Sequence, residues 1–279
     1  MNVFGSSTYK ANHHQLTEAR IQLHYAIQPL AAISNALVDS SHKGVFWDDR
    51  LRFITRAITT IKSCRVALDP IALTLEFLSD HNQIISTFAL SDRTLPEAFD
   101  WMKAIVNELG GAADLIIPIT YPPDDFPDSD LAHGATFKHQ NIIPSLADFA
   151  EYYASADRIL QDIVQHESMA SQVRIWPHHF DIATLISIPS AIDGEEKSIG
   201  VGLSPGDVSY DEPYWYVTPY PYPEARSNLP TLDGDGTWHT QHWVGAILTF
   251  SQFGEPKASI EQVKTFLNSA IAACEKLLA

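Results

Sequence analysis

The order in which helical and strand-like periodicity alternate along the chain constrains the fold more than any other feature. In four segments, apolar residues recur every three or four positions, which is the spacing of one face of an amphipathic helix. These segments cover residues 16–38, 95–109, 146–163 and 260–277. Between the members of each pair lies a block with the two-residue period of strands. This order predicts an α+β fold in two halves, each a mainly antiparallel sheet with flanking helices.

The strand-like segments cover residues 52–61, 71–77, 84–90, 174–188, 199–203, 214–218 and 244–250. We expect two of them, 71–77 and 84–90, to form a β-hairpin. In the C-terminal half, short connections rich in glycine, proline and aspartate favour antiparallel pairing. Two local signals refine the helices. Pro29 removes a backbone donor inside the first helix and predicts a kink or break there. Thr94 and Glu97 form a capping box, which predicts a helix start at residue 95.

A proline- and aspartate-rich segment, residues 118–144, separates the two halves. We therefore predict an N-terminal α+β half at 1–117, a connecting loop at 118–144, and a C-terminal α+β half at 145–279 that holds the candidate pocket. The hydrophobic fraction of 45% indicates a folded chain.

The formal net charge of −16 repels phosphate backbones, so we expect no nucleic-acid partner. The N-terminus lacks the pattern of a signal peptide, and no apolar run approaches the ~20 residues that span a bilayer. Cys64 and Cys274 lie far apart in apolar segments, as buried thiols in a reducing compartment do. These observations predict an acidic cytoplasmic protein without a membrane segment. The oligomeric state stays open.

The segment that runs from Trp176 to Asp181 has the most unusual side chains in the sequence. Here His178 and His179 stand side by side, two positions before an aspartate. If the segment is a strand, His179 and Asp181 share one face. A carboxylate beside an imidazole can orient it, raise its basicity, or join it in holding a metal.

Two more segments of the C-terminal half carry polar and aromatic side chains. Residues 237–243 place His239 and His242 between tryptophans, and residues 204–212 lead from a serine and a proline into acidic groups. His239 and His242 converge only if the backbone turns between them. Ser204 also completes a Gly-x-Ser-x-Gly pattern, but the helix that this motif requires does not follow, so the pattern favours a turn.

These residues support three hypotheses that the sequence alone leaves open. The first is a small-molecule-binding protein whose pocket is lined by a set of polar and aromatic side chains. This set is His178, His179, Asp181, Trp215, Tyr216 and Trp238. The second is a metal-assisted hydrolase in which a divalent metal is the cofactor. Its ligands are His179, Asp181, His239 and His242. The third is a structural or interaction protein without pocket chemistry.

The order of elements also carries a resemblance. A strand with Phe180-Asp181 precedes an acidic, aromatic stretch that includes Glu212-Pro213-Tyr214-Trp215-Tyr216 and Tyr220-Pro221-Tyr222-Pro223. In this order the chain resembles a family of bacterial proteins of unknown function. The resemblance implies a bacterial, cytoplasmic, two-part α+β protein, and it implies no particular activity.

Overall fold

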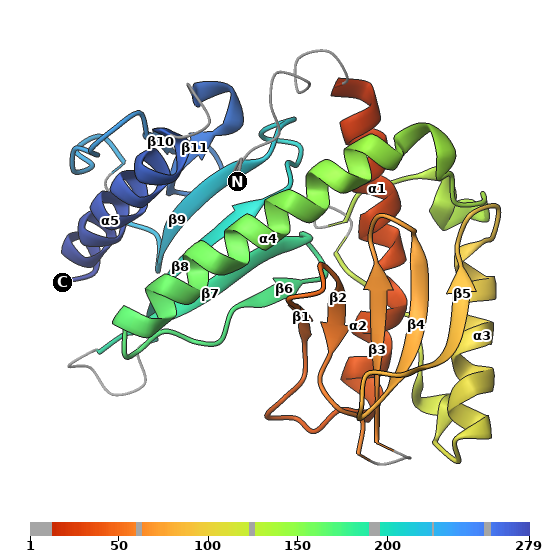
Figure 1. Ribbon diagram of the computed structural model, residues 1–279. Helices are drawn as coiled ribbons and strands as arrows, with labels where there is room; N and C mark the ends of the chain where they lie inside the picture. The colour runs from red at the N-terminus through yellow and green to blue at the C-terminus, as the bar shows by residue number, and fades with distance from the viewer. Residues whose placement is uncertain (1–12, 60–62, 123–125, 190–195, 225, 254–257) are drawn as a thin grey trace. The chain divides into compact units, whose positions relative to one another are not determined.

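The computed structural model describes residues 13–59, 63–122, 126–189, 196–224, 226–253 and 258–279 (Figure 1). The chain folds into two compact units. The N-terminal unit holds the described residues up to Ala154 together with Ile175–Phe180, and the C-terminal unit holds Ser155–Arg174 and Asp181–Ala279. The connecting loop expected at residues 118–144 stays a prediction.

The first predicted helix breaks next to Pro29, as expected. Helix α1 covers His13–Ala26, and α2 covers Gln28–Leu37 with the proline in its first turn. The first turn of a helix tolerates proline, because a backbone N–H there has no partner within the helix. The prediction of a break is therefore confirmed.

The capping box predicted for the next helix is also present. Helix α3, Leu95–Glu108, begins after Thr94, whose hydroxyl accepts the backbone N–H of Glu97 while the Glu97 carboxylate accepts that of Thr94. Further helical segments follow. They are the 3-10 turns η2 (Ala113–Leu115), η4 (Asp130–His133) and η5 (Gln140–Ile142), and the helix α4 (Ile143–His166).

The sheet of the N-terminal unit has the strand order β6-β1-β2-β3-β4-β5, and its pairs are antiparallel. Its strands are β1 (Val45–Trp47), β2 (Phe53–Thr55), β3 (Cys64–Asp69), β4 (Thr74–Ser79), β5 (Ile84–Ala89) and β6 (Arg174–Trp176). Helices α2 and α3 contact this sheet, and Figure 1 shows both on one side of it. The hairpin expected at 71–90 is confirmed as β4 and β5. Of the strand expected over residues 52–61, Phe53–Thr55 forms β2, and residues 60 and 61 lie outside the described residues. Strands β1 and β3 were not predicted.

The sheet of the C-terminal unit has the strand order β10-β11-β9-β8-β7, again antiparallel. Its strands are β7 (Asp181–Ile188), β8 (Lys197–Ser204), β9 (Tyr214–Tyr220), β10 (Thr237–His239) and β11 (Gly245–Thr249). The 3-10 turn η6 (Phe250–Gln252) follows β11 and leads toward α5 (Ala258–Leu278). Helix α5 packs across β8, β9 and β11. An ion pair of 3.1 Å between Lys264 and Asp162 joins α5 to the C-terminal half of α4.

The predicted α+β class with mainly antiparallel strand pairing is confirmed by these elements. The predicted division into two halves, each with its own sheet, stays a prediction. Cys64 and Cys274 are free and fully buried, and burial raises the pKa of their thiols to about 11 and about 12. Both thiols therefore stay protonated at neutral pH. Within the ranges that the structure describes, none of the helices is both long and apolar enough to cross a membrane.

Candidate functional site

The two faces of the C-terminal sheet differ because successive residues of a strand point to opposite sides. Trp215 and Val217 are fully buried, and the Cys274 thiol on α5 contacts the Val217 carbonyl oxygen. Tyr214 and Tyr216 therefore point away from α5. We call the side that they share the tyrosine face. In strand register it contains Asp181, Ala183, Gly200, Gly202, Tyr214, Tyr216, Thr218 and Ile247.

A hydrogen bond between two strands lies on the tyrosine face. The Tyr216 hydroxyl donates to a carboxylate oxygen of Asp181. Gly202 lies between them, since it pairs with Tyr216 on one side and with Ala183 on the other. A Cβ atom at Gly202 would stand 2.7 Å from the Tyr216 hydroxyl oxygen and 2.7 Å from the Ile182 carbonyl oxygen. The glycine thus allows the phenol ring to cross β8 and reach the carboxylate.

Two more tyrosines continue this polar network. The Tyr214 hydroxyl donates to Oδ2 of Asp207 at 2.6 Å, and the Tyr210 hydroxyl donates to Nδ1 of His239 at 2.9 Å. Ring centroids lie 5.0 Å apart between Tyr210 and Tyr214, and 6.3 Å apart between Tyr214 and Tyr216. The tyrosines therefore form a continuous row, and each hydroxyl is oriented by a partner.

His239 is the imidazole at the end of this row. Its Nε2 lies 2.5 Å from the carbonyl oxygen of Gln241, which can only accept, so Nε2 carries the proton. Its Nδ1 is then the acceptor for Tyr210. The ring also stacks on Trp243, with centroids 4.3 Å apart. Both ring nitrogens are thus engaged within the protein.

Burial and nearby carboxylates keep the tyrosines of the row protonated. Burial raises the pKa of the Tyr216 hydroxyl well above its usual value, and the charge of Asp181 raises it further. Burial and then Asp207 raise the pKa of Tyr214 in the same direction. These hydroxyls are therefore hydrogen-bond donors at neutral pH, and they do not supply a phenolate base.

The strand expected through His178 and His179 is a turn. The Phe180 backbone N–H donates to the Trp176 carbonyl oxygen at 2.7 Å, and Phe180 has a left-handed φ of 58°. His179 is exposed in this turn, whereas Asp181 is 7% exposed as the first residue of β7. The expected common face of His179 and Asp181 was therefore wrong, because alternation along a strand does not continue through a turn.

Buried side chains of the N-terminal unit hold this turn in place. The carbonyl oxygen of Pro177 accepts from Nε2 of His24 at 2.9 Å and from Nε2 of Gln28 at 3.1 Å. The Tyr153 hydroxyl donates to the carbonyl oxygen of Phe180, whose ring is fully buried. These contacts stabilise a left-handed conformation that is unfavourable for a bulky residue.

His178 and His179 lie within the N-terminal unit and contact each other there. Their ring centroids are 4.2 Å apart, and the His178 ring lies 6.2 Å from that of Tyr121. Their predicted role in ligand binding stays a prediction.

Two tryptophans, Trp215 and Trp238, were predicted to line the pocket. Trp215 lies on the buried α5 side of β9, opposite to Tyr216. Trp238 pairs with Ala246, which pairs with Val217, so Trp238 also belongs to the α5 side. Its indole N–H donates to the Pro230 carbonyl oxygen at 2.7 Å. Trp215 and Trp238 therefore do not share a face with Tyr216.

The metal hypothesis finds no support in the geometry. Among the residues that the structure describes, no group of three or more His, Cys, Asp or Glu side chains could hold a metal ion. The predicted ligand His242 is exposed, with a left-handed φ of 63°. The other imidazole of that segment, His239, already uses both nitrogens.

Gly202, Tyr210 and Tyr214 belong to the site but were not predicted from the sequence. The alternation of Tyr214, Tyr216 and Tyr220 would have placed these tyrosines on one side of a strand.

The Gly-x-Ser-x-Gly pattern around Ser204 forms a turn, as expected. Ser204 ends β8, and its hydroxyl accepts the backbone N–H of Gly206 at 3.2 Å, as in a turn.

Comparisons of the chain with family models, with curated proteins and with solved structures found no match. The resemblance to a bacterial family of unknown function stays a prediction. The function must therefore be inferred from the side chains themselves.

Proposed function

We propose that the protein binds a small polar organic molecule on the tyrosine face of the C-terminal unit. The observation that supports this most is the nearly buried carboxylate of Asp181, held by the hydroxyl of a half-buried Tyr216. A charge taken out of water costs several kcal/mol, and an apolar pair often stabilises such a position as well or better. A polar pair at this place is therefore explained best by what it binds.

The chemistry of the face indicates the class of ligand. The Asp181 carboxylate is an acceptor, so it suits a hydroxyl or amine group of the ligand. The half-buried rings of Tyr210 and Trp243 offer apolar surfaces with polar edges, on which the carbon skeleton of a small ligand can pack. We therefore infer a ligand that carries both a hydrogen-bond donor and an apolar part.

A ligand screen with matched variants tests this proposal. Polar metabolites would be added to the intact protein, and binding followed by thermal shift and then by calorimetry. Tyr216→Phe removes one hydroxyl while the ring remains, so affinity is expected to fall roughly tenfold, as for one lost hydrogen bond to a charged group. Asp181→Asn removes the charge at constant shape and should weaken an amine more than an alcohol.

Tyr222→Phe is the control, because Tyr222 is an exposed tyrosine in the loop after β9. It should leave the affinity unchanged. The proposal fails if no compound class binds, or if a bound compound keeps its affinity in both Tyr216→Phe and Asp181→Asn. A loss of stability in these variants without any effect on binding would instead support a structural role for the pair.

A further inference from the structure

Strand β5 lies at the end of the N-terminal sheet and contains no charged residue. It is the last strand of the order β6-β1-β2-β3-β4-β5, so only β4 pairs with it in the part of the chain that the structure describes. Its sequence is Ile-Ile-Ser-Thr-Phe-Ala, without proline, lysine or an acidic residue. Natural proteins usually protect the edge of a sheet with charged residues or proline, or keep the edge strand very short. Strand β5 has none of these three protections.

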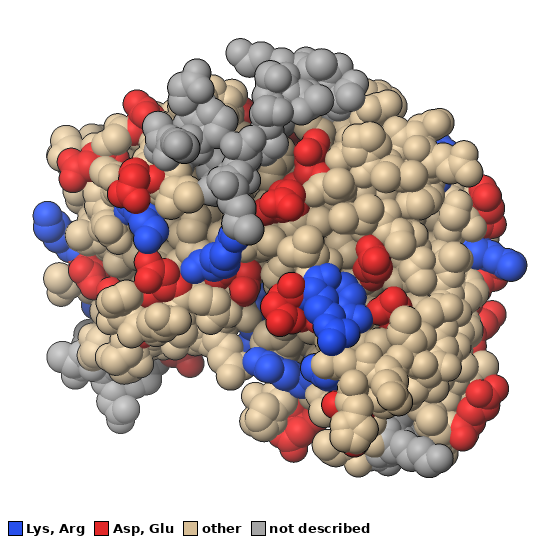
Figure 2. All heavy atoms as spheres, in the orientation of Figure 1, with Lys and Arg blue, Asp and Glu red and all other residues tan. Residues whose placement is uncertain are grey.

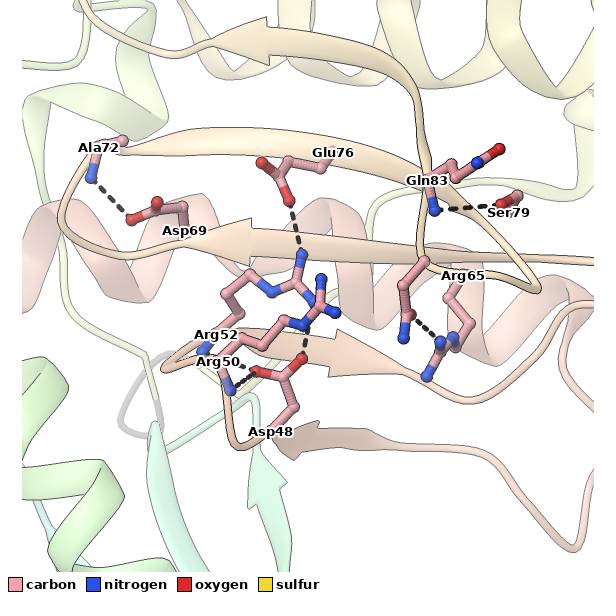
Figure 3. Close-up of polar contacts among 10 residues, drawn as sticks. Asp48, Arg50, Arg52, Arg65, Asp69, Ala72, Glu76, Ser79 and Gln83 are labelled. Atoms are coloured by element: carbon pink, nitrogen blue, oxygen red, sulfur yellow. Dashed lines mark hydrogen bonds and ion pairs between the residues drawn. The ribbon is translucent and has the colours of Figure 1, made fainter.

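The charges of this sheet lie on its inner strands. Figure 2 shows basic and acidic side chains gathered over β1 to β3, next to a mostly uncharged surface over β4 and β5. Figure 3 shows the Arg52 guanidinium between two carboxylates, at 2.9 Å from Asp48 and 2.8 Å from Glu76. The net charge of −16 repels a second copy of the chain over most of the surface. Along β5, two copies can approach without like charges facing each other.

Alternate residues of β5 direct their backbone groups away from β4. The Leu90 N–H donates to the Leu73 carbonyl oxygen at 3.0 Å, so these two residues form a hydrogen-bonded pair. Hydrogen-bonded and non-hydrogen-bonded pairs alternate along an antiparallel ladder. Ala89 and Thr87 lie one and three positions before Leu90, within the regular part of the register. Their N–H and C=O groups therefore point outward, where another strand could bind them.

Apolar side chains flank this edge on both faces of the sheet. Ile84 and Ile85 are 59% and 45% exposed, and Ile84 pairs with Leu78 in the register. On the opposite face, the Phe88 ring stacks on Trp101 of α3 with centroids 5.4 Å apart, and both rings are half-buried. A strand added to β5 would bury apolar surface on both faces in addition to its backbone hydrogen bonds.

We propose that β5 pairs antiparallel with β5 of a second copy of this chain, across a twofold axis. In such a pair each copy presents the same groups to the other, so outward N–H groups of one edge meet outward carbonyl oxygens of the other. A second copy fits because its own edge is uncharged and apolar at the same positions. A six-residue edge buries little surface, so we expect a dissociation constant of about 10 µM. This pairing does not depend on ligand binding by the C-terminal unit.

Two measurements on the intact wild-type protein test the pairing. In analytical ultracentrifugation, the protein should change from monomer to dimer between about 1 µM and about 100 µM. In hydrogen exchange, the outward amide of Thr87 should gain protection as the protein concentration rises. The amide of Phe88, which belongs to a hydrogen-bonded pair with β4, should be protected at every concentration.

Two variants block the edge in different ways. Thr87→Pro removes an outward N–H and no bond to β4, and proline is tolerated at such a position of an edge strand. Ile84→Lys adds a charge to the edge, as natural edge strands do. Each should weaken the dimer roughly tenfold or more. Leu115→Lys is the matched control, because Leu115 is also 59% exposed and lies in the same unit but outside the sheet. It should leave the dimer unchanged.

The proposal is overturned if the wild type stays monomeric at about 100 µM, a result that does not depend on the folding of any variant. It is also overturned if a dimer forms while exchange of the Thr87 amide is independent of concentration, because the dimer then uses another surface. Dimers of Thr87→Pro and Ile84→Lys as tight as that of the wild type would contradict it as well. Growth beyond the dimer into fibrils would identify β5 as an aggregation-prone edge and rule out a closed pair.

Discussion

The N-terminal and C-terminal sheets meet the same structural requirement in different ways. Each packs helices on one face and carries polar side chains on the other, where they must be satisfied. The N-terminal sheet uses charge, with Arg52 between Asp48 and Glu76. The C-terminal sheet uses neutral donors, with Tyr216 hydrogen-bonded to Asp181. One arrangement therefore depends on ion pairing, and the other on the position of a rigid ring.

This difference explains the neighbouring residues. Arginine has a long flexible stem, so it can reach its partners over side chains such as Ile54 and Ala67. Tyrosine has few rotatable bonds, so its ring needs free space along its path. Gly202 provides that space on the C-terminal sheet. The tyrosine face therefore depends on a glycine at this position.

The largest expected effect comes from breaking the ion pairs of the N-terminal sheet. Arg52→Met leaves the largely buried carboxylates of Asp48 and Glu76 without their cation. Removal of one partner from such a network costs about 4 kcal/mol of unfolding free energy. Chemical denaturation followed by tryptophan fluorescence measures this loss.

The second half of this test separates charge from packing. In the double variant Arg52→Met with Glu76→Leu, the Glu76 carboxylate is also removed, and much of the lost stability should return. Asp48 still accepts the backbone N–H groups of Arg50 and Arg52, so it is left unchanged. If the double variant is no more stable than Arg52→Met, ion pairing is not what this face depends on.

The next effect tests the glycine of the C-terminal sheet. The methyl group of Gly202→Ala would stand 2.7 Å from a backbone oxygen, that of Ile182, so strands must move apart. Strain of this kind costs about 3 kcal/mol. Gly200→Ala is the matched control, because its methyl group would meet the side chain of Thr218 at 3.0 Å. Equal melting temperatures for the two variants would contradict the role given to Gly202.

Local signals predicted much of this fold, and contacts between distant segments decided the rest. The break at Pro29 and the capping box of Thr94 and Glu97 depend on a few neighbouring residues, so they can be predicted from the sequence. The turn that ends at Phe180 cannot be predicted in this way. It is held by Tyr153 and His24 from distant helices, and no residue within it requires a left-handed φ.

The candidate site shows the same limit. Asp181 and Tyr216 were both predicted from the sequence, but Asp181 was paired with His179, its neighbour in the chain. The observed partner comes from a strand thirty-five positions away, and its contact across Gly202 depends on the register of three strands. A register follows from packing and turn geometry together, which a single sequence does not specify.

The smallest effect concerns pH, to which the two units respond differently. Burial lowers the pKa of His24 in the N-terminal unit to about 3, and the charges of His179 and Arg20 contribute in the same direction. In the unfolded chain this imidazole titrates near the ordinary value of about 6.5. The unfolded state therefore binds the proton first as pH falls. The N-terminal unit should lose about 2 kcal/mol between about pH 7.5 and about pH 5.

Hydrogen exchange of backbone amides, measured at both pH values, assigns this loss to a unit. Amides of β2 and β3 should lose protection, whereas those of β8 and β9, which belong to the other unit, should keep theirs. His24→Gln removes the titrating group but retains a donor for the Pro177 carbonyl oxygen. This variant should show little of the acid-induced change. If its stability falls with pH as steeply as that of the wild type, His24 is not the group responsible, because a glutamine side chain binds no proton in this range.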